Sequence, residues 1–365
     1  AAATKMTLSS AGTLDVTGGV VVVGSTTVDD ILLTAVALPG AGNPSIALRN
    51  SDNIVYHQSG SADTITFLDA SQNTMAIFHD DEILFQIDNS AALTIDGNRD
   101  VIISDGGNLE TATAGTSNFR AGVNAGDAIA SGGNYNVLIG DEAGTAITTG
   151  DYNTALGFEA LAATTDRNSN TGIGAQTLKT NVNGAKNTAV GSGALFTMNP
   201  NSDVDTFNTA VGFDAGNDIT TGIRNTLMGA EAGDALADAD DNVAIGALAL
   251  SGDTLGSQSV AIGRGALKVQ NFTTATSTYN VAVGYSAGER VTTGVQNVII
   301  GGLAADALTD ADENVAVGFA ALGVDTLGSK STAIGRSALA TQNFTTATDS
   351  HNTAVGYFAG LSVTT

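Results

Sequence analysis

The chain has 365 residues, with 37 acidic and 13 basic side chains giving a formal net charge of −24, 45 glycines, no cysteine and only 5% aromatic residues. A strongly acidic chain repels phosphate backbones, which argues against nucleic-acid partners. Without cysteine there is no disulfide framework, thiolate metal site or cysteine nucleophile. Hydrophobic residues reach 42%, enough to bury a core. Because they are mostly small and aliphatic, we expect thin, closely packed layers.

Residues 1–104 are expected to form a β-rich N-terminal segment. Runs typical of strands alternate with turns, as at Thr13–Gly19, Ser45–Asn53, Thr64–Asn73 and Glu82–Asn98. This pattern predicts short antiparallel hairpins. A glycine-rich join over residues 105–117 then leads into the rest of the chain. No apolar run in the 365 residues approaches the ~20 residues of a membrane-spanning helix, so we expect no membrane insertion by this stretch of chain.

Residues 118–365 are built from one repeat. A five-residue core, Asn or Ser followed by two variable residues, an aliphatic residue and Gly, recurs as NVLIG at Asn136–Gly140 and NTAVG at Asn187–Gly191. From Gly140 the core glycines are spaced 17, 17, 17 and 21 residues apart, three times over, so a 72-residue period lies on top of the shorter one. Frequent glycines and the lack of 3.6-residue spacing argue against helices. The repeat predicts an all-β parallel solenoid in which one unit is one coil.

The core suggests a role for each of its positions. Positions two (Thr or Val) and four (aliphatic) share a face, and we assign that face to the coil interior. Position three is mostly Ala, which leaves room for a close neighbour such as a second chain. The Asn or Ser at position one would stack as a polar ladder between coils. The Gly would adopt a positive φ or permit close backbone approach at a corner.

The number of coils sets the expected dimensions of the solenoid. Coils stacked about 4.8 Å apart would make a rod roughly 65 Å long from about 14 coils. Such a thin rod buries little surface per chain, so we expect an oligomer. The chain does not begin with Met, and it ends within the repeat pattern. We therefore expect it to be a piece of a longer polypeptide.

The string NTAVG-x-x-AG with TTG turns resembles the repeats of bacteriophage tail fibres, and the SVAIG and STAIG variants are similar to head repeats of trimeric autotransporter adhesins. Thr4–Gly19 and Ala91–Ser104 resemble fibre segments that join β-prism or triple-helical modules. Both families imply homotrimeric, extended β fibres that contact a cell surface. The 17-residue unit is longer than the usual adhesin head coil. The chain also lacks the chaperone domain or membrane anchor that would separate the two families.

Acidic turns recur at one place in the 72-residue period, as ADADDN at Ala237–Asn242 and TDADEN at Thr309–Asn314. Clustered carboxylates beside Asn suit a hard cation such as Ca²⁺. The simpler hypothesis, which we favour, is a solvated acidic turn without any cofactor. The candidate metal-binding residues are Asp238, Asp240, Asp241, Asp310, Asp312 and Glu313.

Every fourth coil carries four extra residues. The first of these inserts is NPNSDVDTF at Asn199–Phe207, and the second and third read NFTTAT at Asn271–Thr276 and at Asn343–Thr348. These inserts could touch a partner, although Phe272 and Phe344 favour packing on neighbouring coils. No catalytic triad, phosphate-binding loop or metal motif stands out, so we expect no enzyme activity.

Three functions are compatible with these features. The first is an extracellular virion tail-fibre shaft that associates with itself, with other tail or fibre proteins and with a host cell-surface glycan or protein. The second is a bacterial cell-surface adhesin or extracellular filament. The third is a glycan-degrading fibre that uses paired carboxylates.

Overall fold

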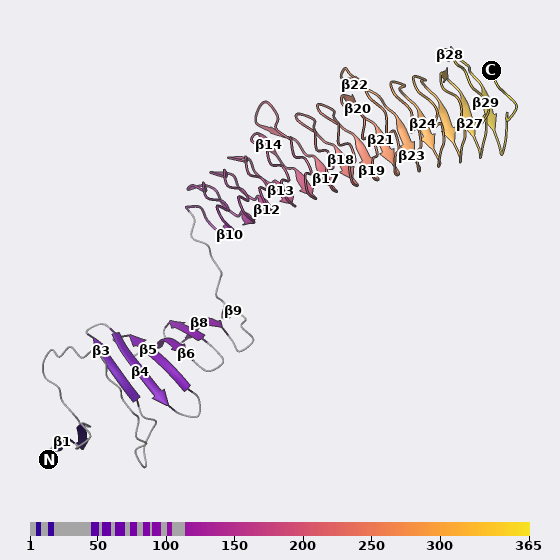
Figure 1. The fold of residues 1–365 in the computed structure, drawn as a ribbon. Coiled ribbons are helices and arrows are strands. Elements are labelled where there is room, and N and C mark those ends of the chain that lie inside the picture. Colours follow the sequence, from indigo (N-terminus) through magenta and orange to yellow (C-terminus); the bar gives the residue numbers. More distant parts are fainter. Residues whose placement is uncertain are drawn as a thin grey trace. The chain divides into compact units, whose positions relative to one another are not determined.

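The computed structural model describes the backbone of nine strands between residues 5 and 103, and residues 114–365 with their side chains. Contacts divide the chain into two compact units, Ala1–Leu109 and Glu110–Thr365. Their boundary falls within the join expected at 105–117, most of which lies outside the described residues. The described residues form strands and turns without a helix (Figure 1). None of them therefore provides a helix with the length and apolarity needed to cross a membrane.

The described strands of the first unit pair antiparallel. One pair stands alone, and the other seven strands form a sheet in which each strand pairs with the next along the chain. The pair is β1 (Lys5–Leu8) and β2 (Leu14–Thr17). The sheet contains β3 (Ser45–Asn50), β4 (Asn53–Ser59), β5 (Asp63–Asp69), β6 (Thr74–Phe78), β7 (Ile83–Ile87), β8 (Ser90–Ile95) and β9 (Val101–Ile103).

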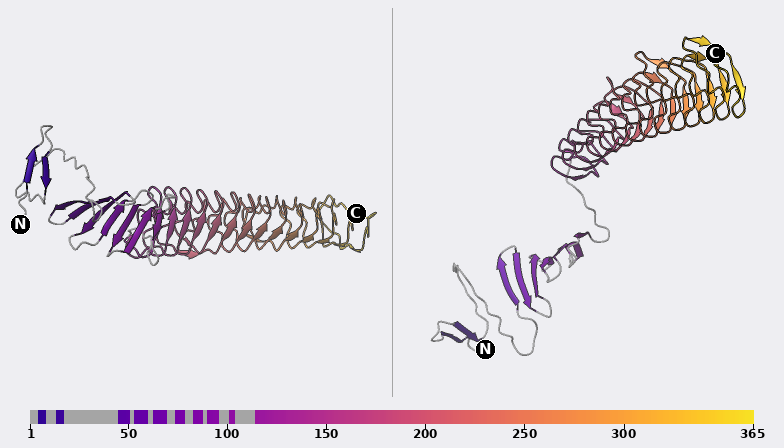
Figure 2. Two further views of the ribbon diagram at one scale, coloured as in Figure 1. Left: turned by 90° about the horizontal axis from the view of Figure 1, so that it is seen from below. Right: turned by 45° about the vertical axis from the view of Figure 1, so that its right-hand side comes forward.

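The second unit is a parallel β-solenoid of about 14 coils, as the repeat predicts (Figures 1 and 2). Each coil contributes one three-residue strand to a single 14-stranded sheet, and equivalent core positions pair in register, for example Thr209 with Thr226. The strands are β10 (Phe119–Ala121), β11 (Val137–Ile139), β12 (Thr154–Leu156), β13 (Thr171–Ile173), β15 (Thr188–Val190), β17 (Thr209–Val211), β18 (Thr226–Met228), β19 (Val243–Ile245), β21 (Val260–Ile262), β23 (Val281–Val283), β24 (Val298–Ile300), β25 (Val315–Val317), β27 (Thr332–Ile334) and β29 (Thr353–Val355).

Each 21-residue coil adds a short strand that pairs, in parallel, with a strand of the coil before it. The three pairs recur at the 72-residue period, so the four extra residues are accommodated in the same way each time. The pairs are β14 (Gly184–Ala185) with β16 (Val204–Asp205), β20 (Gly256–Ser257) with β22 (Thr276–Ser277), and β26 (Gly328–Ser329) with β28 (Thr348–Asp349).

The structure reverses the predicted assignment of the two strand faces. Position three is the interior position: Ala189, Ala244 and Ala316 are fully buried. Positions two and four, which we assigned to the interior, are half-buried or exposed on the outer face of the sheet. Period-two alternation separates two faces but does not say which is inside. The small residue points inward because Leu, Ile and Ala side chains from the rest of the coil already fill the narrow interior.

Side-chain size is matched across that interior. Position nine, counted from the core Asn or Ser, is a buried Leu in many of the coils whose position three is Ala, as in Leu195 and Leu250. Where position three is larger, position nine is small. A Cβ added to Gly233 would lie 2.9 Å from the Cδ2 atom of Leu227. In these coils the two positions complement each other in volume. In three coils both positions are small, as at Ala210 and Gly216, and Leu195 and Leu227 of the neighbouring coils approach that Gly.

A ladder of buried side chains runs along the solenoid, as predicted for position one, with Asn at most rungs and Ser259 and Ser331 at two. The Oδ1 atom of Asn225 accepts the backbone N–H of Asn242 in the next coil at 3.0 Å. Its Nδ2 atom donates to the carbonyl of Ala239 in its own coil at 2.7 Å. Asn136, Asn153 and Asn297 make equivalent pairs of bonds. Each rung thus joins two coils and closes a turn.

The core Gly forms a corner, as predicted. Gly229 has φ of +139°. A Cβ there would lie 2.6 Å from the carbonyl carbon of Gly246 in the next coil. Only glycine tolerates both conditions, because its backbone enters this region freely and it has no side chain to clash.

Replacing Asn225 with Ala tests the ladder. The change leaves the N–H of Asn242 and the carbonyl of Ala239 buried without these partners, so we expect a loss of about 2–4 kcal/mol in the free energy of unfolding. Urea unfolding followed by circular dichroism measures it. Asn201→Ala, in an exposed insert, is the matched control and should change stability little. Equal losses in the two variants would contradict a stabilising ladder.

Candidate functional site

The acidic turns use their carboxylates to connect successive coils. The side chains of Asp238 and Asp310 accept hydrogen bonds from the hydroxyls of Thr221 and Thr293 in the preceding coil. Asp240 accepts the backbone N–H of Ile223 at 2.8 Å. Asp312 accepts the equivalent N–H of Val295 at the same distance. These four carboxylates therefore act as rungs of a second, partly exposed ladder beside the Asn ladder.

The last acidic residue differs between the two turns. Asp241 forms two bonds with the guanidinium of Arg224, at 2.6 and 2.8 Å, and the hydrogen bond from Arg224 lowers the pKa of this carboxyl. In the next period the same two places hold Glu313 and Gln296. Within residues 114–365, no three or more His, Asp or Glu side chains are grouped so that they could hold a metal ion. The calcium site stays a prediction, and in a single chain these carboxylates serve hydrogen bonds and an ion pair.

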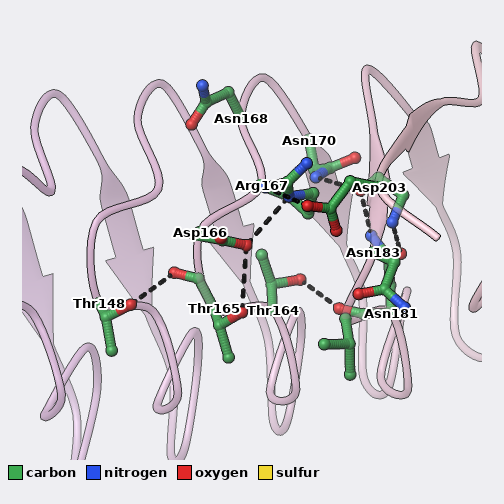
Figure 3. A network of polar contacts seen from close by, with 12 residues as sticks. Thr148, Thr164, Thr165, Asp166, Arg167, Asn168, Asn170, Asn181, Asn183 and Asp203 are labelled. Carbon is green, nitrogen blue, oxygen red and sulfur yellow. Dashed lines mark hydrogen bonds and ion pairs between the residues drawn. The ribbon is translucent and has the colours of Figure 1, made fainter.

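An earlier copy of the acidic turn begins at Asp166, 72 residues before Asp238. It pairs its carboxylate with an arginine that the sequence analysis did not single out. Arg167 lies between Asp166, at 3.0 Å, and Asp203, at 3.2 Å. Figure 3 shows this group together with Thr148 and Thr164, whose hydroxyls donate to backbone carbonyls of the next coil. The hydrogen bond from Arg167 lowers the pKa of Asp166. Since Asp203 belongs to the first insert, Arg167 ties that insert to a coil earlier in the stack.

The inserts are packed at their base and exposed at their tips. The ring of Phe272 is only 6% exposed. A Cβ on Gly256, in the preceding coil, would lie 2.9 Å from its Cδ2 atom. Phe344 is half-buried in the equivalent place, while Thr273, Thr274 and Ala275 are exposed. The insert therefore combines the two roles considered from sequence, with a packed base and a tip open to solvent.

The outer face of the 14-stranded sheet, formed by positions two and four, is uncharged along its whole length. Its aliphatic side chains are partly open to solvent, with Leu156 42% and Ile300 40% exposed. Position six adds exposed aromatic rings directly after the core Gly. This aromatic column was missed from sequence; five coils contribute rings to it, whereas Asp141, Arg264 and Arg336 occupy position six in other coils. The rings belong to Phe158, Phe213, Tyr285, Phe319 and Tyr357.

Outside the acidic turns, two of the described acidic residues have a carboxyl with a raised pKa. Burial, together with the nearby charges of Glu231 and Asp218, raises the pKa of Asp234 to about 6. The Oδ1 atom of Asp234 is buried without a hydrogen-bond partner. Burial also raises the pKa of Asp306, one 72-residue period later. The ionised form of Asp234 is thus unfavourable in the folded coil.

The raised pKa of Asp234 predicts a pH-dependent effect of Asp234→Asn. At pH 7.5 the folded wild-type chain must hold an unfavourable charge, so the variant should have the higher Tm. As the pH falls through about 6 the wild-type carboxyl gains its proton, and the advantage should shrink by pH 4.5. Thermal unfolding at both pH values measures this. A variant with a lower Tm at pH 7.5, or an advantage that grows on acidification, would contradict the prediction.

The chain matches no protein-family model, no curated protein and no solved structure. The functional conclusion therefore depends on the geometry described above.

Proposed function

We propose that the solenoid is the shaft of an extracellular structural or adhesive fibre, of the kind that in phage tail fibres spaces or presents host-receptor-binding elements. The observation that carries the proposal is the unbroken stack of about 14 coils, which extends one uncharged face of aliphatic and Thr side chains from the first coil to the last. A parallel stack of this kind sets distance along one axis. Its inserts return at a fixed interval, which suits a shaft that carries contact points.

The proposal includes self-association through the outer sheet face, and the composition and size of that face support it. The face holds no charged residue at positions two and four, although the chain carries a net charge of −24. Fourteen strands about 4.8 Å apart and three residues wide present roughly 600 Å², to which the aromatic column adds further area, and stable interfaces bury about 800 Å² per partner. A partner must also repeat at the coil spacing to match the face along its length. Other copies of this chain meet that requirement.

We propose three copies, the number implied by the resemblance to fibre repeats. The sequence analysis gave the second chain a place at position three, but position three is interior. The outer face with positions two and four is the surface that can meet other chains. Other fibre proteins and a host-surface glycan or protein would bind elsewhere, and the exposed insert tips are available for this. The proposal includes no enzymatic activity and no nucleic-acid partner.

A bacterial cell-surface adhesin or extracellular filament remains the alternative, because the same shaft would serve it. A glycan-degrading fibre is the second alternative. Incubation with host-surface polysaccharides followed by analysis of reducing ends would test it. Release of oligosaccharides would support the degrading fibre.

The native mass of the assembly tests the proposal. Native mass spectrometry should give three chains, whereas a stable monomer would contradict self-association. Ile245→Glu combined with Ile262→Glu places charges on the outer face and should release monomers that keep their β-sheet circular dichroism. Thr274→Glu combined with Thr346→Glu adds the same charge at exposed insert tips and should leave the assembly intact. Assembly that survives the face substitutions would also overturn the proposed interface.

A further inference from the structure

One interior column of the solenoid, at position twelve of the coil, holds both apolar and polar side chains. Position twelve of the coil holds fully buried Ile147, Ile219 and Leu236. In the second and third 21-residue coils the same column holds a Gln, and in the coil that precedes each of them it holds an Asp. Asp253, Gln270, Asp325 and Gln342 are all completely buried there. A buried carboxylate is costly unless it is fully hydrogen-bonded, so its partners matter.

Asp253 joins its own coil to the start of the following insert. Its Oδ1 atom accepts the backbone N–H of Gly256 at 3.0 Å and of Phe272 at 3.1 Å. Its Oδ2 atom accepts the Nε2–H of Gln270 at 2.6 Å. Asp325 repeats these three bonds one period later, with Gly328, Phe344 and Gln342. Phe272 and Phe344 directly precede the exposed tip of each insert, so the carboxylate fixes the point where the insert leaves the coil.

Gln270 connects this carboxylate to the Asn ladder. The second Nε2 hydrogen is donated to the hydroxyl oxygen of Ser259 at 2.9 Å. The Oε1 atom of Gln270 accepts the Nδ2–H of Asn280 at 2.8 Å. Ser259 occupies a rung where most coils have Asn, and its short side chain cannot reach as far. Gln270 thus bridges the rung that Ser259 shortens, and Gln342 makes the same bonds with Ser331 and Asn352.

In the first 72-residue period, different side chains occupy the positions of Asp253, Gln270 and Phe272. Asn181, Met198 and Pro200 stand where the second period has Asp253, Gln270 and Phe272. Proline has no N–H to offer a carboxylate. Asn181 instead accepts the N–H of Gly184 at 2.8 Å and donates to the carbonyl of Gly184 at 2.8 Å. The rung here is Asn187 rather than Ser, so no bridging amide is needed and Met198 is apolar.

We propose that Asp253 and Asp325 are positioning residues that clamp the base of the inserts, and that Asp–Gln–Phe and Asn–Met–Pro are alternative clamp sets whose members depend on one another. In the Asp set every donor meets an acceptor. Asp253→Asn would turn an Nδ2 donor toward the Nε2 donor of Gln270. If Gln270 flipped to receive it, Nε2 would face the Nδ2 donor of Asn280. A single exchange therefore leaves one buried donor without an acceptor.

The experiment uses the full chain and compares four proteins: Asp253→Asn, Gln270→Met, a triple variant that combines both with Phe272→Pro in a Ser259→Asn background, and Asp238→Asn as an exposed control. Ser259→Asn supplies the Asn rung that accompanies the Asn–Met–Pro set in the first period. Hydrogen exchange by mass spectrometry follows peptides that cover the second insert, with those of the first and third inserts as internal references. Asp253→Asn should speed exchange around Gly256 and the second insert about tenfold, equivalent to about 1.4 kcal/mol. The triple variant should recover most of the protection.

The outcomes separate a clamp from general stability. A clamp predicts that faster exchange stays local to the second insert and that the triple variant is better protected than Asp253→Asn alone. Unchanged exchange in Asp253→Asn would overturn the proposal. So would a triple variant that is no better protected than the single variants, because the two sets would then not be interchangeable. If Asp253→Asn fails to fold, Gln270→Met alone tests the same dependence, since it leaves Asp253 and Asn280 without their shared partner.

Discussion

The buried Asn ladder is the interaction on which the solenoid depends. Backbone pairing in a parallel sheet fixes the spacing of coils, but with strands of three residues it leaves most of each 17-residue coil outside the sheet. The Asn at position one bonds forward to the next coil and across to the end of its own coil. It thereby satisfies buried backbone groups that have no strand to pair with. Corner glycines, interior alanines and the acidic rungs each lie at a fixed number of residues from the ladder residue of their coil.

Repeat arithmetic predicted most of this fold. Spacings of 17 and 21 residues gave the coil, the number of coils and the ladder, because identical residues at a fixed interval must occupy equivalent places in a stack. The orientation of the strand faces was predicted wrongly. Alternation alone is symmetric, and the deciding information is the volume supplied by position nine, where Leu195 or Leu250 fills the interior beside a small position three. That compensation between distant positions becomes visible only when the coil is closed.

The candidate sites were predicted less completely than the fold. The acidic residues were found because they recur at 72 residues, yet their partners are backbone N–H groups and Thr hydroxyls of the preceding coil, which composition does not reveal. Non-glycine residues with positive φ, such as Tyr152 and Leu161, were also missed. Hydrogen bonds between coils offset the strain of this backbone conformation, and residue propensities read from one sequence do not include such bonds. The hydrogen bonds at the base of the inserts were missed for the same reason, since Asp253 bonds to residues of two coils.

Residue-resolved amide hydrogen exchange on the intact chain tests the ladder most directly. The backbone N–H groups of Asn153, Asn225 and Asn297, each bonded to the Oδ1 atom of the rung before it, should be among the slowest to exchange. Protection at equivalent Asn positions should return along the chain at intervals of 17, 17, 17 and 21 residues. Exchange at these Asn positions as fast as at the exposed insert tips, or protection without that spacing, would contradict the account.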